Sequence, residues 1–221
     1  MGPAKETGLA RSDHWGSVRR FTPSSWTRSV EWPTHVTVAS ARFSRSALPS
    51  LATRGRSADL GITDVVELDW WQNRTERGLT FTCVPAQHFS GRTPWDRNRR
   101  LWAGWTVQGR DRRLYFAGDT GRFGGFKQIG ERLGPFDLAA LPIGAYLPPG
   151  IMKPSHMSPE EALAALADVR ARLLVPIHWG TFDLADEPIA DPPKRLQLEA
   201  RRLHLGTDRI WLLRHGETRS W

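Results

Sequence analysis

Residues from about Gly61 to the C-terminus alternate strand patterns with helix patterns, and this alternation restricts the chain to a few fold classes. Residues 79–84 (LTFTCV) alternate apolar and polar side chains, which predicts a half-buried strand. A second strand is predicted at 113–119 (RLYFAGD), and the continuous apolar run at 136–144 predicts a strand covered on both faces. Strands that alternate with helices predict an α/β or mixed α+β layered fold.

The segment 158–174 combines several signals for the start of a helix. Ser158 is a suitable N-cap, a proline follows it at the first helical position, and Glu161 stands at the capping-box position. The apolar stripe of this predicted helix runs on to Leu173, and a strand that ends at His178 follows. The remaining predicted elements are helices at 126–134 and 192–206 and a final strand at 209–217.

The first 60 residues differ in character from the rest of the chain. They are rich in Ser and Arg, and only Val36-Thr37-Val38 alternates in the manner of a strand. This composition predicts a poorly patterned N-terminal segment, 1–60, that is weakly ordered or aberrant. We place the boundary at about residue 60 and expect the structured portion of the domain at 61–221.

The net charge of +8 does not by itself indicate a nucleic-acid-binding protein. Residues 1–60 hold nine Lys and Arg against four Asp and Glu, a net +5, so the remaining residues carry only +3. No helix-turn-helix, zinc-finger or similar signature accompanies the charge. We therefore expect no nucleic-acid partner, whereas anionic substrates and an anionic membrane surface remain open as partners.

The sequence also contains signals that bear on the cellular compartment of the protein. No run approaches the roughly 18 apolar residues of a membrane span, and residues 1–30 lack the apolar stretch of a signal peptide. The single cysteine, Cys83, excludes an internal disulfide and is expected to be a small buried hydrophobe. We expect a cytoplasmic protein, with peripheral contact to a membrane as an open addition.

Three of the predicted strands lead into potential metal ligands, namely His88, Asp119 and His178. These residues are separated by 31 and 59 positions, so only the tertiary structure can bring them together. Sites in α/β sheets collect beyond the carboxyl ends of the strands, and two imidazoles with one carboxylate suit zinc. The alternative is structural, because a histidine can end a strand and Asp119 can bind backbone amides in a turn.

Seven stretches in order resemble the metallo-β-lactamase superfamily, and within it the branch of N-acyl-phosphatidylethanolamine-hydrolysing phospholipase D enzymes and their bacterial relatives. The resemblance covers about residues 60–221, and it implies an αβ/βα sandwich with a di-zinc site between two sheets. The stretches are VELDWWQ (66–72), AQHFSGR (86–92), RNRRLWAGW (97–105), YFAGDTG (115–121), GPFDLAALPIGAY (134–146), HMSPEEA (156–162) and IHWGTF (177–182).

The resemblance implies a role for four residues. His88 matches a ligand of the first zinc, Asp119 the catalytic carboxylate that bridges both zincs, and His178 a ligand of the second. His156 is implied as a catalytic residue near the substrate phosphate, where it orients or protonates a leaving oxygen. Each residue also has a plainer reading as an ordinary loop or strand-end side chain. Candidate substrate-binding residues, with the same plain alternative, are Gln87, Tyr146 and Lys153.

One departure from the family pattern is large. The signature His-x-His-x-Asp-His, which supplies four further ligands in the family, occurs nowhere in this chain. Asp13-His14 reproduces only its last two letters, and we transfer no role to it. The sequence therefore predicts a sandwich that is incomplete in its N-terminal half, through truncation or a reading-frame disturbance, with a partial zinc site.

The function implied by the resemblance is that of a zinc-dependent hydrolase, specifically a phosphodiesterase with a phospholipid-like substrate. In an intact relative, a hydroxide held between two zincs attacks phosphorus. The alternatives are a sugar-phosphate lactonase of the same superfamily and a catalytically impaired fragment of such an enzyme. A homodimer is a further open expectation.

Overall fold

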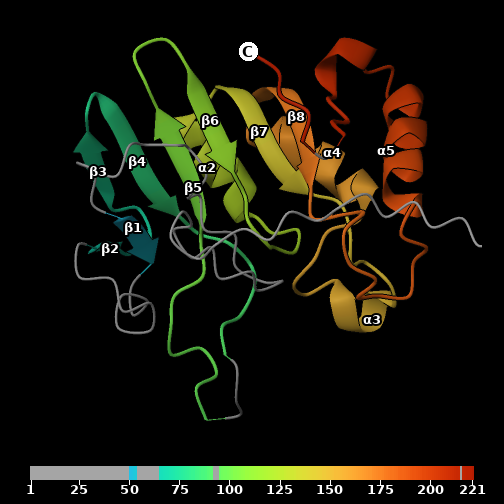
Figure 1. Ribbon diagram of the computed structural model, residues 1–221, viewed down its shortest axis with the longest axis horizontal. Helices are drawn as coiled ribbons and strands as arrows, with labels where there is room; N and C mark the ends of the chain where they lie inside the picture. The colour runs from blue at the N-terminus through green and yellow to red at the C-terminus, as the bar shows by residue number, and fades with distance from the viewer. Residues whose placement is uncertain (1–49, 54–64, 92–94, 215) are drawn as a thin grey trace, which may run out of the picture. The chain divides into compact units, whose positions relative to one another are not determined.

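The computed structural model describes residues 50–53, 65–91, 95–214 and 216–221 (Figure 1). Its centre is a six-stranded sheet with the order β3-β4-β5-β6-β7-β8. The strands are β3 (Asn73–Glu76), β4 (Leu79–Val84), β5 (Gly104–Gln108), β6 (Arg113–Phe116), β7 (Phe136–Pro142) and β8 (Ala171–Ile177).

The sheet changes from antiparallel to parallel at β6. Strands β3 to β6 pair as antiparallel neighbours, whereas β6, β7 and β8 pair in parallel. Because β4 and β6 both run opposite to β5, they point in the same direction as β7 and β8. The carboxyl ends of four strands therefore lie at one edge of the sheet, and this edge positions the site.

The helices pack around the parallel half of the sheet. Helix α4 contacts both β7 and β8, and α2 and α5 contact α4 (Figure 1). The helices are α2 (Gly125–Leu133), α3 (Pro149–Met152), α4 (Pro159–Asp168), α5 (Asp191–Arg202) and the 3-10 turn η2 (Thr207–Arg209). None of the helices in the described ranges is long and apolar enough to cross a membrane.

The start of α4 agrees with the sequence prediction. The Ser158 hydroxyl accepts a hydrogen bond from the backbone N–H of Glu161, and the Glu161 carboxylate accepts one from the backbone N–H of Ser158. Because Pro159 has no N–H, this reciprocal pair satisfies two of the three N–H groups that the start of α4 leaves without partners within the helix.

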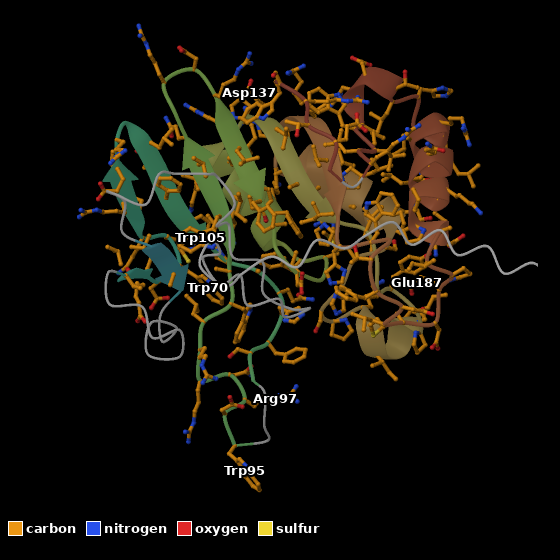
Figure 2. All side chains as sticks on the ribbon, viewed as in Figure 1. Trp70, Trp95, Arg97, Trp105, Asp137 and Glu187 are labelled. Carbon is orange, nitrogen blue, oxygen red and sulfur yellow. The ribbon has the colours of Figure 1, made fainter. Side chains whose placement is uncertain are left out.

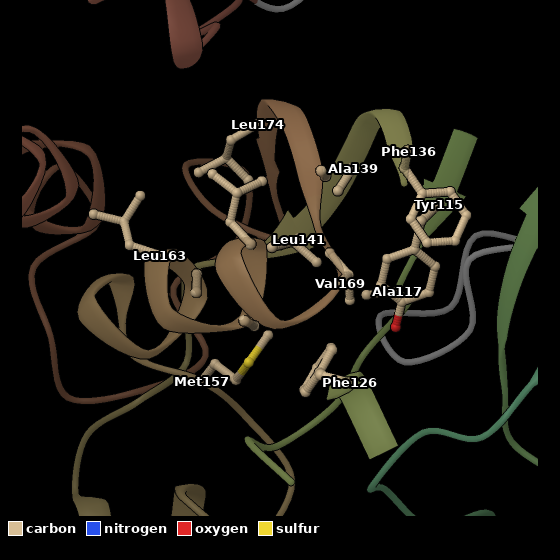
Figure 3. Close-up of a cluster of buried hydrophobic side chains, with 14 of the residues drawn as sticks. Tyr115, Ala117, Phe126, Phe136, Ala139, Leu141, Met157, Leu163, Val169 and Leu174 are labelled. Atoms are coloured by element: carbon tan, nitrogen blue, oxygen red, sulfur yellow. The ribbon is translucent and has the colours of Figure 1, made fainter. Parts of the chain in front are cut away.

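The main core lies where α2 and α4 cover β6, β7 and β8 (Figure 3). Leu141 and Leu174 from the strands are fully buried, as is Phe126 from α2. The opposite face of the parallel strands is also buried, since Leu138 is 6% and Leu173 only 1% exposed. This burial on both faces agrees with the continuous apolar run in the sequence.

A smaller cluster lies on the antiparallel half of the sheet. Cys83 is fully buried there against Leu68 and Trp105, as the sequence analysis expects. Trp70 packs at the edge of this cluster and donates its indole N–H to the carbonyl oxygen of Trp102 at 2.8 Å (Figure 2). These tryptophans therefore have structural partners of their own.

Two predictions of secondary structure are wrong. Helix α4 ends at Asp168 instead of running on, and Leu173 belongs to β8, where it pairs with Leu138 of β7. Arg170, with φ of 59°, turns the chain between helix and strand. Among the described residues of the predicted final strand at 209–217, only Ile210 pairs with the sheet, in one parallel bridge to Leu174.

The region before residue 65 is described only in part. Residues 50–53 form β1 (Ser50–Thr53), which pairs in parallel with β2 (Val65–Leu68). The rest of the 1–60 segment, including Val36-Thr37-Val38, lies outside the described residues. The weak order expected there and the domain boundary at residue 60 stay predictions.

Helix α2 approaches α4 so closely that Gly130 has no room for a side chain. A Cβ atom at Gly130 would overlap the carbonyl oxygen of Asp168 and lie 2.9 Å from the carbonyl carbon of Val169. Gly130→Ala should therefore destabilise the fold. Overpacking against backbone atoms costs about 3 kcal/mol, while the higher helix propensity of Ala returns about 1 kcal/mol, for a net loss of about 2 kcal/mol.

Urea unfolding followed by circular dichroism measures this loss. The matched control is Gly124→Ala at the N-cap of the same helix, where a Cβ meets nothing within 4 Å. The control should cost less than about 1 kcal/mol, the loss expected when Ala replaces Gly at an N-cap. Equal effects of the two substitutions would contradict the close contact between α2 and α4.

Candidate metal centre

Three strands deliver side chains to the same edge of the sheet. His88 follows β4, Asp119 follows β6 and His178 comes directly after β8. A fourth residue, His156, arrives from the turn between α3 and α4. The structure thus brings together residues that are up to 90 positions apart in the sequence, from His88 to His178.

The four side chains form one cluster. The ring centroid of His156 lies 5.3 Å from that of His88 and 5.2 Å from that of His178. The Nε2 atom of His178 lies 3.5 Å from Oδ1 of Asp119. This last distance fits an ion pair, but the two atoms do not meet the geometry of a hydrogen bond.

The tautomer of His88 follows from its surroundings. Its Nδ1 lies 2.9 Å from the backbone carbonyl oxygen of Phe89, and a carbonyl oxygen only accepts hydrogen bonds. Nδ1 therefore carries the proton in the neutral ring, which leaves a lone pair on Nε2. Nε2 is buried and has no hydrogen-bond partner, which is the arrangement of a metal-binding histidine oriented by a backbone carbonyl.

Asp119 is a buried carboxylate whose two oxygens both lack a hydrogen-bond partner. The residue is only 8% exposed, and a buried charge without hydrogen bonds is costly. Burial alone would raise the pKa of Asp119, but the neighbouring imidazoles, first of all His178, outweigh burial and hold this pKa below its usual range. The carboxylate is therefore ionised, with oxygens available to a cation.

The backbone at His178 is held in an uncommon conformation. Its φ of 59° lies in the left-handed region, which costs free energy for a residue with a side chain. Gly144 packs against it so tightly that a Cβ at Gly144 would overlap the carbonyl oxygen of His178. Burial lowers the pKa of His178, but the Asp119 carboxylate outweighs burial and raises it overall.

His156 has the opposite electrostatic character. Burial, followed by the nearby His178 and His88, lowers its pKa to about 4. The ring is therefore neutral at pH 7, and its buried Nδ1 has no hydrogen-bond partner. A neutral imidazole in this position can accept a proton or donate one hydrogen bond.

Glu187 is a site residue that the sequence analysis missed (Figure 2). Its buried carboxylate accepts hydrogen bonds from three successive backbone N–H groups, those of Ala145 at 2.5 Å, Tyr146 at 3.3 Å and Leu147 at 3.0 Å. These residues directly follow Gly144. No periodicity in the sequence around Glu187 indicates this role, because its partners lie about 40 positions away.

The three candidate substrate-binding residues have protein partners in the structure. The Gln87 side-chain amide donates to the carbonyl oxygen of Pro154 at 2.9 Å. The Tyr146 hydroxyl donates to Asp191 at 2.5 Å, and Lys153 lies 3.3 Å from Glu161. Tyr146 and Lys153 line a cavity of about 250 Å³ together with His156. Their substrate contacts, like the catalytic and metal-binding roles, stay predictions.

The cluster offers the kinds of ligand atoms that bind metal ions. It offers a carboxylate with two free oxygens and an imidazole nitrogen with a free lone pair, which are ligands that zinc accepts. Within the described residues, however, no three His, Cys, Asp or Glu side chains converge closely enough to form a complete metal site. Residues outside the described ranges are not covered by this finding, so the partial zinc site stays a prediction.

The family follows from comparison with known proteins. The model of the Beta-lactamase superfamily domain matches residues 12–179, and the chain belongs to this superfamily. The match begins about fifty residues before the seven motifs, and directly before Asp13-His14. The mixed sheet with its helices is thus part of the metallo-β-lactamase sandwich, as the sequence analysis expects.

Relatives of known sequence include proteins with and without a named activity. An uncharacterized protein of Mycobacterium tuberculosis is 50% identical over 146 residues, 64% of this chain and 38% of that protein. The N-acyl-phosphatidylethanolamine-hydrolyzing phospholipase D 1 of Caenorhabditis elegans is 48% identical over 139 residues, 61% of this chain and 39% of that protein. The matched part of the chain thus spans less than two fifths of these relatives.

Solved structures share the fold. Igni18, a metallo hydrolase from Ignicoccus hospitalis, superimposes with a TM-score of 0.57 at 24% identity, over 74% of this chain and 64% of that chain. An isothiocyanate hydrolase from Delia radicum gut bacteria gives a TM-score of 0.58 at 19% identity, over 78% of this chain and 67% of that chain. At such identities the likeness concerns the fold alone.

Replacing the Glu187 carboxylate tests how firmly it holds the strand ends. Glu187→Gln keeps the side-chain shape but leaves one neutral acceptor for three N–H groups. We expect a loss of about 1.5–3 kcal/mol in unfolding free energy, the range for hydrogen bonds to a charged group. Urea unfolding of the metal-free chain at pH 7 measures it.

The matched control is Glu131→Gln on α2. The Glu131 side chain is 59% exposed and lies 4.0 Å from Lys127, so its removal should change stability by less than about 0.5 kcal/mol. If Glu187→Gln were as mild as the control, Glu187 would not hold residues 145–147.

Proposed function

We propose that this chain carries one part of the catalytic site of a zinc-dependent phosphodiesterase that acts on phospholipid-like substrates. The observation that supports it is the buried cluster of His88, Asp119, His156 and His178, whose unpartnered nitrogen and oxygen atoms suit a cation. The similarity to the Caenorhabditis elegans phospholipase D supports the substrate class.

Each residue of the cluster has a distinct part in this proposal. His88, Asp119 and His178 would hold the metal, and the metal when bound supplies a Lewis acid and lowers the pKa of bound water. His156 is neutral at pH 7 because its pKa is lowered to about 4, so it can donate a hydrogen bond to a phosphoryl oxygen. Gly144 leaves room for the His178 carbonyl oxygen, and Glu187 binds the backbone N–H groups of the three residues after Gly144.

A second candidate is a catalytically impaired member of the same superfamily. The absence of a His-x-His-x-Asp-His motif from the sequence favours it. A catalytic zinc normally has three protein ligands and an open position for water. His88, Asp119 and His178 alone would give two metals too few protein ligands for tight binding, and the activation of water would be lost with it.

Zinc binding by the purified chain tests both candidates. We expect weakly held zinc, slow zinc-dependent hydrolysis of bis(p-nitrophenyl) phosphate, and loss of both in His178→Asn. The matched control is His204→Asn, an exposed position with φ of 53°, close to the 59° of His178. Asn tolerates the left-handed region, so both substitutions preserve the backbone. Zinc content after dialysis and release of nitrophenol are the measurements.

The outcomes separate the alternatives. Equal zinc content in the parent chain and His178→Asn would contradict the metal centre. Hydrolysis of a sugar-phosphate lactone but of no phosphodiester would favour the lactonase. Two tightly held zincs with rapid turnover would exclude the impaired form, and would mean that residues 1–60 supply ligands, which Asp13→Asn and His14→Asn would then locate.

A further inference from the structure

Large apolar side chains are exposed mainly around the candidate metal centre. Nine are exposed among the described residues, and six of them belong to three segments at the carboxyl edge of the sheet. Isolated exposed apolar residues are common, but a gathering around one site indicates a binding surface. The six are Phe89, Trp95, Ile151, Phe182, Leu184 and Ile189, and we call them the apolar rim.

Each segment of the rim borders the cluster. The ring of Phe89 stacks on His88 with 4.7 Å between centroids. Phe182 and Leu184 line a cavity of about 240 Å³ that also contains Asp119 and His178. Ile151 lies on α3. Pro149, at the start of this helix, and Lys153, directly after it, line the cavity that His156 also lines.

The most exposed member of the rim lies on a projecting loop. Figure 2 shows Trp95 at the end of the loop that follows His88, well away from the sheet. Its side chain is 80% exposed, which is costly in water for a large indole. Such a position favours a partner that takes up an aromatic ring without a preformed pocket.

Positive charge accompanies Trp95 on this loop. Arg97 and Arg99 are exposed, and neither forms an ion pair within the described part of the chain. The guanidinium of Arg97 lies 5.4 Å from the ring centroid of Phe89. The one acidic neighbour, Asp96, is paired with Arg100 at 2.7 Å, so the loop presents cations beside its aromatic ring.

We propose that the apolar rim docks on an anionic phospholipid bilayer, with Trp95 at the boundary between headgroups and acyl chains and Arg97 and Arg99 against lipid phosphates. Trp is favoured at membrane interfaces, and basic residues near the surface add electrostatic attraction. A second copy of the chain fits less well, because a two-fold contact would bring the same arginines together. Docking needs no catalysis, so it stands apart from the proposed hydrolysis.

Vesicle sedimentation of the full chain tests the docking. Phosphatidylcholine vesicles with and without phosphatidylglycerol are compared at low and high salt. Binding should be stronger with phosphatidylglycerol and should weaken as salt screens the charges. Trp95→Ser should lower the partition constant about tenfold, the lower end of the effect of burying a large apolar side chain.

The matched control is Trp221→Ser, a second Trp-to-Ser change at the C-terminus, which lies on the far side of the molecule from α3 in Figure 1. It should leave the partition constant within about twofold, and unchanged circular dichroism should show that both variants fold. Arg97→Glu combined with Arg99→Glu should reduce binding to phosphatidylglycerol vesicles and leave binding to phosphatidylcholine vesicles unchanged.

Three results would overturn the proposal. The first is that the parent chain does not sediment with either kind of vesicle. The second is that Trp95→Ser and Trp221→Ser lose binding equally. The third is that the chain does not bind vesicles and sedimentation velocity shows a dimer that depends on Trp95. Loss of vesicle binding with zinc-dependent phosphodiester hydrolysis retained would reject the docking alone. Vesicle binding without hydrolysis would support the docking and count only against the proposed activity.

Discussion

The buried carboxylate of Asp119 is the constraint on which the rest of the site depends. It is ionised, enclosed and without a hydrogen-bond donor, so it needs positive charge nearby. The protein meets this need in part with imidazoles and keeps His88 in the tautomer that presents a lone pair. A bound cation would neutralise the remaining negative charge of Asp119. Such a role would explain why the fold keeps a buried carboxylate without hydrogen bonds.

Backbone geometry serves the same end. His178 adopts a left-handed conformation, and its carbonyl oxygen lies where only a residue without a Cβ fits at position 144. Glu187 fixes the three residues after Gly144 through their N–H groups. The buried, multiply bonded carboxylate thus stabilises the segment that packs against the candidate ligand.

One edge of the sheet carries both the chemistry and the exposed apolar rim. Four strands end at this edge, and the loops that follow them place polar side chains inward and apolar side chains outward. In the proposed arrangement, the cluster would face a membrane surface while the rim contacts it. A phospholipid-like substrate and a docking rim with Trp95 are therefore physically consistent, although each rests on separate observations.

The sequence by itself determined the local features. The capping box at Ser158 and Glu161 started α4, the alternation in LTFTCV defined β4, and His88, Asp119 and His178 stood at recognisable strand ends. These signals lie within one helical turn or one strand, where a residue's neighbours in sequence are its neighbours in space. Only the tertiary structure decided that Leu173 joins β8, that the described residues of 209–217 contribute one bridge to the sheet, and that Glu187 binds the backbone after Gly144. Sheet order and close backbone contact set those outcomes, and both depend on partners that lie tens of residues away.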